Sequence, residues 1–214
     1  MLVSKIMTRN PVYAHPDLSL TEARSLMDRE KIGHLPVLNK DNALVGLITA
    51  VDLLQAGPSS ATTLDMYEIS YLLSKLTVNR VMEKNVITVQ ETEVIEEAAR
   101  IMADRGIGCL PVMNQSLLVG IITDTDIFRF FVTAFGARHQ GIRISINFRE
   151  RPGQLAAFAD AVAQKGGNIV AFVTSEGDDA AHRRATLKIT GLSRADVEAI
   201  AGSLDGSLVE DIRE

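Results

Sequence analysis

The first two thirds of this chain contain one sequence unit that is repeated about 75 residues later. The segment Ile-Gly-His-Leu-Pro-Val at 32–37 returns as Ile-Gly-Cys-Leu-Pro-Val at 107–112, and Gly-Leu-Ile-Thr-Ala-Val-Asp at 46–52 returns as Gly-Ile-Ile-Thr-Asp-Thr-Asp at 120–126. Two blocks that keep their order and nearly keep their spacing indicate a duplicated supersecondary unit. One copy is too short to bury a good core alone, so we expect the two copies to pack face to face as a pseudo-twofold pair.

Each copy predicts the same order of short elements. An extended run precedes a helix, for which Ser19 with Glu22 forms a capping box in the first copy and Thr92 is the expected N-cap in the second. Gly33 and Gly108 are the expected helix stops. Two β-rich runs follow, and a second helix begins after Thr49 or Thr123. The extended runs are 11–14 and 86–89, the β-rich runs are 35–38, 44–49, 110–113 and 117–123, and the buried helix faces are Leu20, Ala23 and Met27, and Ile95, Ala98 and Met102.

The segment between the copies has two parts. Residues 57–63, rich in Gly, Pro, Ser and Thr, are typical of a linker. Residues 64–76 predict an amphipathic connecting helix whose apolar stripe contains Ile69, Leu72, Leu73 and Leu76. The stripe could pack on the repeats as core or form a dimer contact, and the sequence leaves both open.

The charge balance disfavours two classes of partner. A net charge of -5 and a pI near 5.4, without basic blocks, argue against nucleic acid and against anionic membrane surfaces. The single cysteine, Cys109, permits no internal disulfide, as is usual in a reducing compartment. No apolar run has the length of a signal peptide core or a membrane span, so we expect a soluble cytoplasmic protein.

The repeated motif Gly-x-x-Thr-x-x-Asp can bind a ligand or cap a helix. Thr49 and Thr123 offer hydroxyls that donate and accept, while Asp52 and Asp126 offer acceptors suited to ribose hydroxyls. The strand-to-helix junction also supplies free N–H groups suited to a phosphate or sugar. The same Thr and acid at this spacing form an ordinary capping box, and duplication does not decide between the two readings.

Residues 1–56 and 77–136 resemble the two repeats of a CBS-domain pair. The resemblance rests on the openings Ile-Met-Thr at 6–8 and Val-Met-Glu at 81–83, on Gly-x-Leu-Pro-Val, and on Gly-x-Ile-Thr-x-x-Asp. It implies a two-lobed disc that binds an adenosine-based ligand (AMP, ADP, ATP or S-adenosylmethionine) in clefts between the repeats. The resemblance implies that Thr49 with Asp52, and Thr123 with Asp126, contact the ribose and phosphate. It implies that residues 12–14, including Tyr13, and residues 86–88, including Thr88, border the base. It also implies that His34 to Pro36 and Cys109 to Pro111 form the apolar walls.

One departure from the family bears on ligand charge. Family members often carry Arg or Lys just before the motif Asp, where this chain has Val51 and Thr125, and Asp124 adds a negative charge. This favours AMP or a less charged adenosyl ligand over a polyphosphate. The nearby basic residues Lys5, Arg9, Arg80 and Lys84 could compensate, although each is more typical of a solvated charge.

The four histidines do not indicate catalysis or metal binding. His34 lies in an apolar run, where a packed or water-bonded histidine is more common than a catalytic one. His15, His139 and His182 have no metal-ligand spacing, so we predict no metal site and no catalytic residue.

After a boundary at 138–141, residues 141–214 predict a separate βαββαβ domain of ferredoxin-like type, which makes the chain a mixed α+β or α/β protein. Ile142, Ile144, Ile146 and Phe148 alternate with polar residues as in a half-buried strand. The segment resembles an ACT domain through Glu-Arg-Pro-Gly-Gln-Leu at 150–155 and Gly-Gly-Asn-Ile at 166–169. That resemblance implies pairing of sheet edges and an amino-acid site with Gly153, Gln154 and Asn168 as contacts, or dimerisation without a ligand.

The whole chain resembles bacterial CBS/ACT regulatory proteins named after acetoin utilisation. We therefore expect a non-catalytic, allosteric regulatory sensor that needs no cofactor, forms a homodimer and regulates a separate enzyme in trans. An alternative is an amino-acid-sensing protein in which the repeats are only a scaffold. An enzyme is a third possibility, which the sequence does not support, because it has no nucleophile elbow, Walker loop or zinc spacing.

Overall fold

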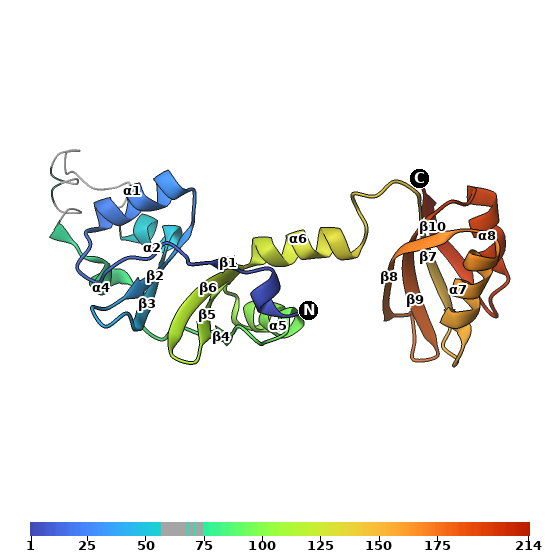
Figure 1. Cartoon of the computed structure of the whole chain (residues 1–214), viewed down its shortest axis with the longest axis horizontal. Coiled ribbons are helices and arrows are strands. Elements are labelled where there is room, and N and C mark those ends of the chain that lie inside the picture. The colour runs from blue at the N-terminus through green and yellow to red at the C-terminus, as the bar shows by residue number, and fades with distance from the viewer. Residues whose placement is uncertain (57–67, 69–70, 72–74) are drawn as a thin grey trace. The chain divides into compact units, whose positions relative to one another are not determined.

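The computed structural model describes residues 1–56, 68, 71 and 75–214, and these form two compact units, Met1–Ile127 and Phe128–Glu214 (Figure 1). The predicted linker 57–63 and most of the predicted connecting helix 64–76 lie outside the described residues. The division between the units falls inside helix α6 (Asp124–Ala134), before the loop at 138–141 where the sequence placed a boundary.

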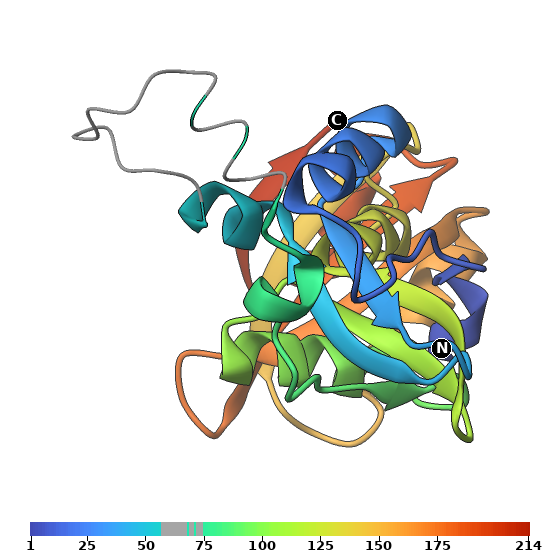
Figure 2. The same ribbon diagram turned by 90° about the vertical axis from the view of Figure 1, so that its left-hand side faces the viewer.

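The first unit contains both repeats as far as Ile127 (Figure 2, blue to green), and the two copies have corresponding helices and strands. In each copy a helix is followed by an antiparallel strand pair and then by a second helix, as the sequence predicts. The first copy has η1 (Val3–Lys5), β1 (Thr8–Arg9), α1 (Leu20–Glu30), β2 (His34–Leu38), β3 (Leu44–Thr49) and α2 (Ala50–Gln55). The second has α4 (Val78–Val81), β4 (Val89–Gln90), α5 (Ile95–Arg105), β5 (Cys109–Asn114), β6 (Leu117–Thr123) and α6.

The apolar faces predicted for the first helix of each copy are buried. Leu20, Ala23 and Met27 of α1 and the matching Ile95, Ala98 and Met102 of α5 are each at most 5% exposed. Ser19 and Glu22 form the predicted capping box, with the Glu22 N–H donating to the Ser19 Oγ at 3.2 Å. These local predictions are confirmed.

Several predicted element ends are wrong. Helices α1 and α5 end before Gly33 and Gly108, because Lys31 (φ 55°) and Gly106 (φ 63°) adopt the left-handed conformation that closes a helix. The N-cap of α5 is Val94, which makes no side-chain capping bond, so Thr92 does not cap it. Of the two extended runs, 86–89 ends in β4, while 11–14 makes only a single bridge from Ala14 to Val37.

The two repeats exchange their leading segments, defined here as residues 1–9 and 76–84. Thr8 and Arg9 of the first repeat pair with β6 of the second, and Glu83 of the second pairs with Leu47 of β3 in the first. A second pair of bridges, Leu2 to Val94 and Thr77 to Ser19, joins each leading segment to the start of the first helix of the other repeat. All these partners are equivalent under the sequence repeat, so the predicted pseudo-twofold relation is present in the backbone pairing.

The second unit has the predicted βαββαβ order, with strands arranged β10-β7-β9-β8 and all neighbours antiparallel. Helices α7 and α8 lie on one face of the sheet (Figure 1), and its core includes Ile144, Phe148, Phe158 and Val197. The elements are β7 (Ile142–Arg149), α7 (Gln154–Gln164), β8 (Asn168–Glu176), β9 (His182–Thr190), α8 (Arg194–Gly202) and β10 (Leu208–Arg213). In the parts of the chain that the structure describes, no helix is both long and apolar enough to cross a membrane.

Candidate functional site

A cavity of about 730 Å³ lies in the first unit and is lined by both repeats. Its volume is within the range typical of small-molecule sites, about 300–1,000 Å³. The first repeat contributes the start of β2 and the junction of β3 with α2, while the second contributes its leading segment and the turn after α5. The lining residues are Gly33, His34, Leu47, Thr49 to Asp52, Glu83, Asn85 to Ile87 and Arg105 to Cys109.

Thr49 and Asp52 line this cavity and also cap helix α2. The Asp52 Oδ2 accepts from the Thr49 N–H at 2.7 Å and from the Thr49 Oγ1 at 2.8 Å. The Asp52 N–H donates to the Thr49 Oγ1 at 3.2 Å, which completes a reciprocal capping box. The capping reading of the motif is confirmed, and the bonds that cap the helix also hold the Asp52 carboxylate at the cavity wall.

Thr123 and Asp126 repeat this geometry at the start of α6. The Asp126 Oδ2 accepts from the Thr123 N–H at 2.9 Å and from the Thr123 Oγ1 at 2.8 Å, and Asp126 is 8% exposed. Neither residue lines the 730 Å³ cavity. The structure therefore brings together only one of the two predicted Thr–Asp pairs with the other cavity residues.

His34 and Cys109 occupy equivalent positions at the starts of β2 and β5, and both line the cavity. Burial lowers the pKa of His34, although the carboxylates of Asp124 and Asp52 favour its charged form. Burial also raises the pKa of the Cys109 thiol to about 12, and Asp124 adds to this effect. At neutral pH this wall therefore presents a neutral thiol and a histidine biased toward its neutral form.

Two charged residues of the cavity, Glu83 and Arg105, are absent from the sequence-based prediction. The Glu83 backbone makes two hydrogen bonds of 2.9 Å to Leu47, and its Oε1 accepts from the Asn85 N–H at 2.6 Å. Arg105 is the last residue of α5 and is exposed. Glu83 could have been placed only by knowing that the leading segment crosses to the other repeat. The basic residues suggested instead, Lys5, Arg9, Arg80 and Lys84, do not line the cavity.

Four other predicted contacts lie outside the cavity lining. Pro36 and Pro111 are buried within β2 and β5, two residues after His34 and Cys109. Thr88 directly follows the lining residue Ile87 and is half-buried. Tyr13 is 42% exposed and makes an edge-to-face ring contact with His15 at 5.5 Å.

The three predicted amino-acid contacts of the second unit do not converge within one chain. Gly153 and Gln154 follow the carboxyl end of β7 and begin α7, where Gly153 has a φ of 89°. Asn168 begins β8 and pairs with Thr190, at the end of the sheet where β7 begins. Among the residues described in either unit, no group of three or more His, Cys, Asp or Glu is placed to hold a metal ion.

The family model of the CBS domain matches residues 3–59 and 78–133, one match for each repeat. The CBS domain pair of protein MJ0100, solved with 5′-methylthioadenosine and S-adenosyl-L-methionine, is 31% identical with a TM-score of 0.52, covering 65% of this chain and 98% of that one. A structure named for acetoin utilization (AcuB) from Vibrio cholerae is 30% identical with a TM-score of 0.54, covering 64% and 95%. CBSX2 in complex with AMP is 28% identical with a TM-score of 0.50, covering 61% and 96%.

Curated relatives include much longer proteins with enzyme names. The L-aspartate semialdehyde sulfurtransferase of Methanocaldococcus jannaschii is 32% identical over 131 residues, which are 61% of this chain. The homoserine O-acetyltransferase of Methanosalsum zhilinae is 35% identical over 126 residues, or 58% of this chain. The matched region is 23% of the length of each of these relatives.

Proposed function

The chain belongs to the CBS-domain family, and on that premise we propose that it is a non-catalytic regulatory sensor that binds an adenosine-based ligand between its two repeats. The observation that carries the proposal is the 730 Å³ cavity, in which both repeats surround the Thr49–Asp52 pair. Solved relatives with the same pair of repeats hold S-adenosyl-L-methionine and 5′-methylthioadenosine, or AMP. Candidate ligands are therefore AMP, ADP, ATP and S-adenosylmethionine.

The cavity offers suitable chemistry for each part of an adenosyl ligand. The Asp52 carboxylate, held in place by its two bonds from Thr49, can accept from ribose hydroxyls. Val86, Ile87, Ile107 and Leu47 supply apolar surface for a base. Arg105 is the cation available to an acidic group, while Asp52 and Glu83 oppose a high negative charge. This balance favours AMP or a less charged adenosyl compound over ATP.

We place the regulated activity in another protein. The relatives named as enzymes share with this chain a region that is less than a quarter of their length. A ligand that changes the packing of the repeats would then act on a cytoplasmic partner enzyme in trans. Detectable turnover of any adenosyl compound by the purified chain would contradict this proposal.

The second unit is proposed as an ACT-like domain that serves for dimerisation or for amino-acid sensing. One observation favours a ligand: Gly153, the N-cap of α7, has no side chain, so no side chain of the N-cap covers the N–H groups that follow Gln154. A nearby Gln154 offers an amide. The competing proposal is that this unit alone senses a ligand and the CBS pair is a scaffold.

Thermal unfolding of the full chain separates these proposals. AMP, ADP, ATP, S-adenosylmethionine, 5′-methylthioadenosine and a panel of amino acids are each added at several concentrations. A ligand at 100 times its Kd adds about 2.7 kcal/mol to the free energy of unfolding, which raises the Tm measurably. If no adenosyl compound raises the Tm, the adenosyl proposal fails. If only amino acids raise it, the scaffold alternative replaces it.

A further inference from the structure

We infer that the two equivalent clefts of the CBS pair differ in charge, so that only the cleft at Asp52 binds a nucleoside monophosphate and each chain binds one. The inference rests on the proposed function. It comes from comparing each residue that lines the described cavity with the residue at the equivalent position of the other repeat.

The structure supports this comparison because the repeats are equivalent in detail around the clefts. The Ala50 N–H donates to the Gly33 carbonyl at 2.9 Å, and the Asp124 N–H donates to the Gly108 carbonyl at 3.0 Å. The Thr49–Asp52 and Thr123–Asp126 boxes have the same bonds within 0.2 Å. The lining residues of the described cavity therefore identify the residues that border the equivalent cleft at Asp126.

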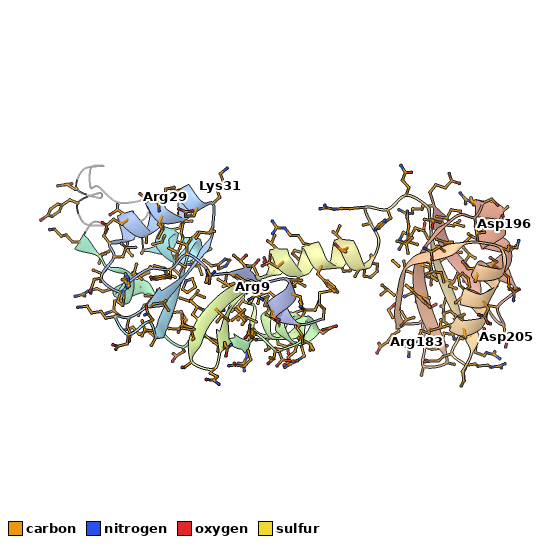
Figure 3. All side chains as sticks on the ribbon, in the orientation of Figure 1. Arg9, Arg29, Lys31, Arg183, Asp196 and Asp205 are labelled. Carbon is orange, nitrogen blue, oxygen red and sulfur yellow. The ribbon has the colours of Figure 1, made fainter. Side chains whose placement is uncertain are left out.

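Four of these substitutions change the charge. Arg105 corresponds to Glu30, and Ala50 corresponds to Asp124, so the cleft at Asp126 loses a cation and gains two carboxylates. Thr8 stands in the place of Glu83, which removes one carboxylate. Lys31, in the place of Gly106, adds a cation, but it is exposed and its side chain extends away from the ribbon (Figure 3). Glu30 is partly offset by its 2.8 Å ion pair with Arg29.

Asp124 also occupies the backbone group that an anion would use. Its Oδ1 accepts from the N–H and from the Oγ1 of Thr125, in the first turn of α6. An incoming phosphate would therefore meet a carboxylate that already accepts from the Thr125 N–H at the helix start. In the cleft at Asp52 the same position is the uncharged Ala50. The Asp124 carboxylate also lies beside Gly108, a lining residue of that cleft, so the difference between the two clefts rests foremost on Arg105 against Glu30. A phosphate beside Asp124 would be repelled at short range in a partly buried site.

Calorimetric titration of the full chain with AMP tests this inference. We expect one AMP per chain, with any second binding event at least about tenfold weaker. Asp124→Ala should raise the stoichiometry toward two, and Ala50→Asp should weaken the first event by at least about tenfold. The matched control is Asp160→Ala, which removes one exposed carboxylate from α7 in the second unit. It should leave the number of AMP molecules bound and the affinity of the first binding event unchanged.

The outcomes separate the inference from the function on which it rests. Two AMP molecules bound per chain with equal affinity would overturn the inference and leave the proposed function intact. One AMP per chain in both the wild type and Asp124→Ala, while Ala50→Asp binds normally, would also overturn it. If AMP, S-adenosylmethionine and 5′-methylthioadenosine all fail to bind, the proposed function itself fails.

Discussion

The side chain of Met82 packs directly on the Cα of Gly46, so closely that a Cβ at Gly46 would overlap the Met82 sulfur. Met7 has the same relation to Gly120, where a Cβ would lie 2.5 Å from the sulfur and 3.0 Å from the Thr8 carbonyl oxygen. These two contacts are equivalent under the repeat, and each joins a leading segment of one repeat to a strand of the other.

Gly120→Ala should therefore destabilise the first unit. The added methyl must displace both Met7 and the Thr8 backbone, and overpacking of this kind costs about 1–3 kcal/mol of unfolding free energy. Denaturant unfolding of the full chain measures the change. Gly202→Ala, at the end of α8 where nothing lies within 4 Å of the added Cβ, is the control and should not destabilise. Equal stability of Gly120→Ala and wild type would show that the contact is not tight.

Asp52→Ala should reduce both stability and ligand binding. Loss of the capping box removes two hydrogen bonds at the start of α2, which costs about 0.5–2 kcal/mol, and removes the proposed ribose acceptor. Ser19→Ala is the matched control because it destroys the capping box of α1, which lies outside the cavity. Both variants should lower the Tm, but only Asp52→Ala should abolish the rise in Tm caused by an adenosyl ligand. A ligand response that survives in Asp52→Ala would contradict the assigned site.

These capping boxes show what local sequence patterns can predict. The Ser19–Glu22 box, the Thr49–Asp52 box and the alternating strand at 142–149 depend only on residues close in sequence, and the structure has all three. The helices end at Lys31 and Gly106, two residues before Gly33 and Gly108, and the sequence does not reveal these ends because a residue other than the expected glycine can adopt the left-handed conformation.

The residues that line the cavity are predictable only in part, because some of them are brought there by contacts between segments far apart in the sequence. Thr49, Asp52, His34 and Cys109 belong to the repeated motif and line the cavity as the resemblance implies. Glu83 lines the cavity because the leading segment of the second repeat pairs with β3 of the first. Arg105, at the end of α5, lines it because the two repeats pack together. No short sequence pattern encodes either arrangement. Tyr13, Pro36, Thr88 and Pro111 lie near the motif in sequence but are not among the lining residues.

The protein should lose stability on mild acidification through His34. Burial lowers the folded-state pKa of His34 below the unfolded value of about 6.5. At pH values between these two pKa values, the unfolded chain binds more protons than the folded chain. The free energy of unfolding therefore falls as the pH drops from about 6.5 toward the folded-state pKa. Denaturant unfolding measures this effect. The unfolding free energy of the wild type minus that of His34→Gln should decrease between about pH 7.5 and about pH 5.

The control for this measurement is His139→Gln, which changes the number of histidines at an exposed position. Its unfolding free energy should follow the wild type at every pH. Parallel pH profiles for wild type and His34→Gln would mean that the protonation of His34 does not differ between the folded and unfolded states.

Cys109 should resist thiol reagents in the folded protein. A rise in the thiol pKa from 9.0 to about 12 lowers the thiolate fraction at pH 8 by a factor on the order of 1,000, and 3% exposure limits access further. Labelling with a chromogenic disulfide reagent, before and after addition of denaturant, measures this protection. Since the chain has one cysteine, all the signal comes from Cys109. Native labelling at the unfolded rate would contradict the burial of this thiol.

The exchange of leading segments has a consequence for the history and the engineering of the chain. A single repeat, released from its neighbour, would keep a leading segment with no strand to join and a strand edge with no segment to cover it. Two such molecules could satisfy each other only by swapping these segments, as in a domain-swapped dimer. When both repeats belong to one polypeptide, they associate within the molecule, at a high effective concentration of each repeat near the other. A single chain thus keeps the contacts of a swapped dimer while its two halves can differ in sequence, as they do at Ala50 and Asp124.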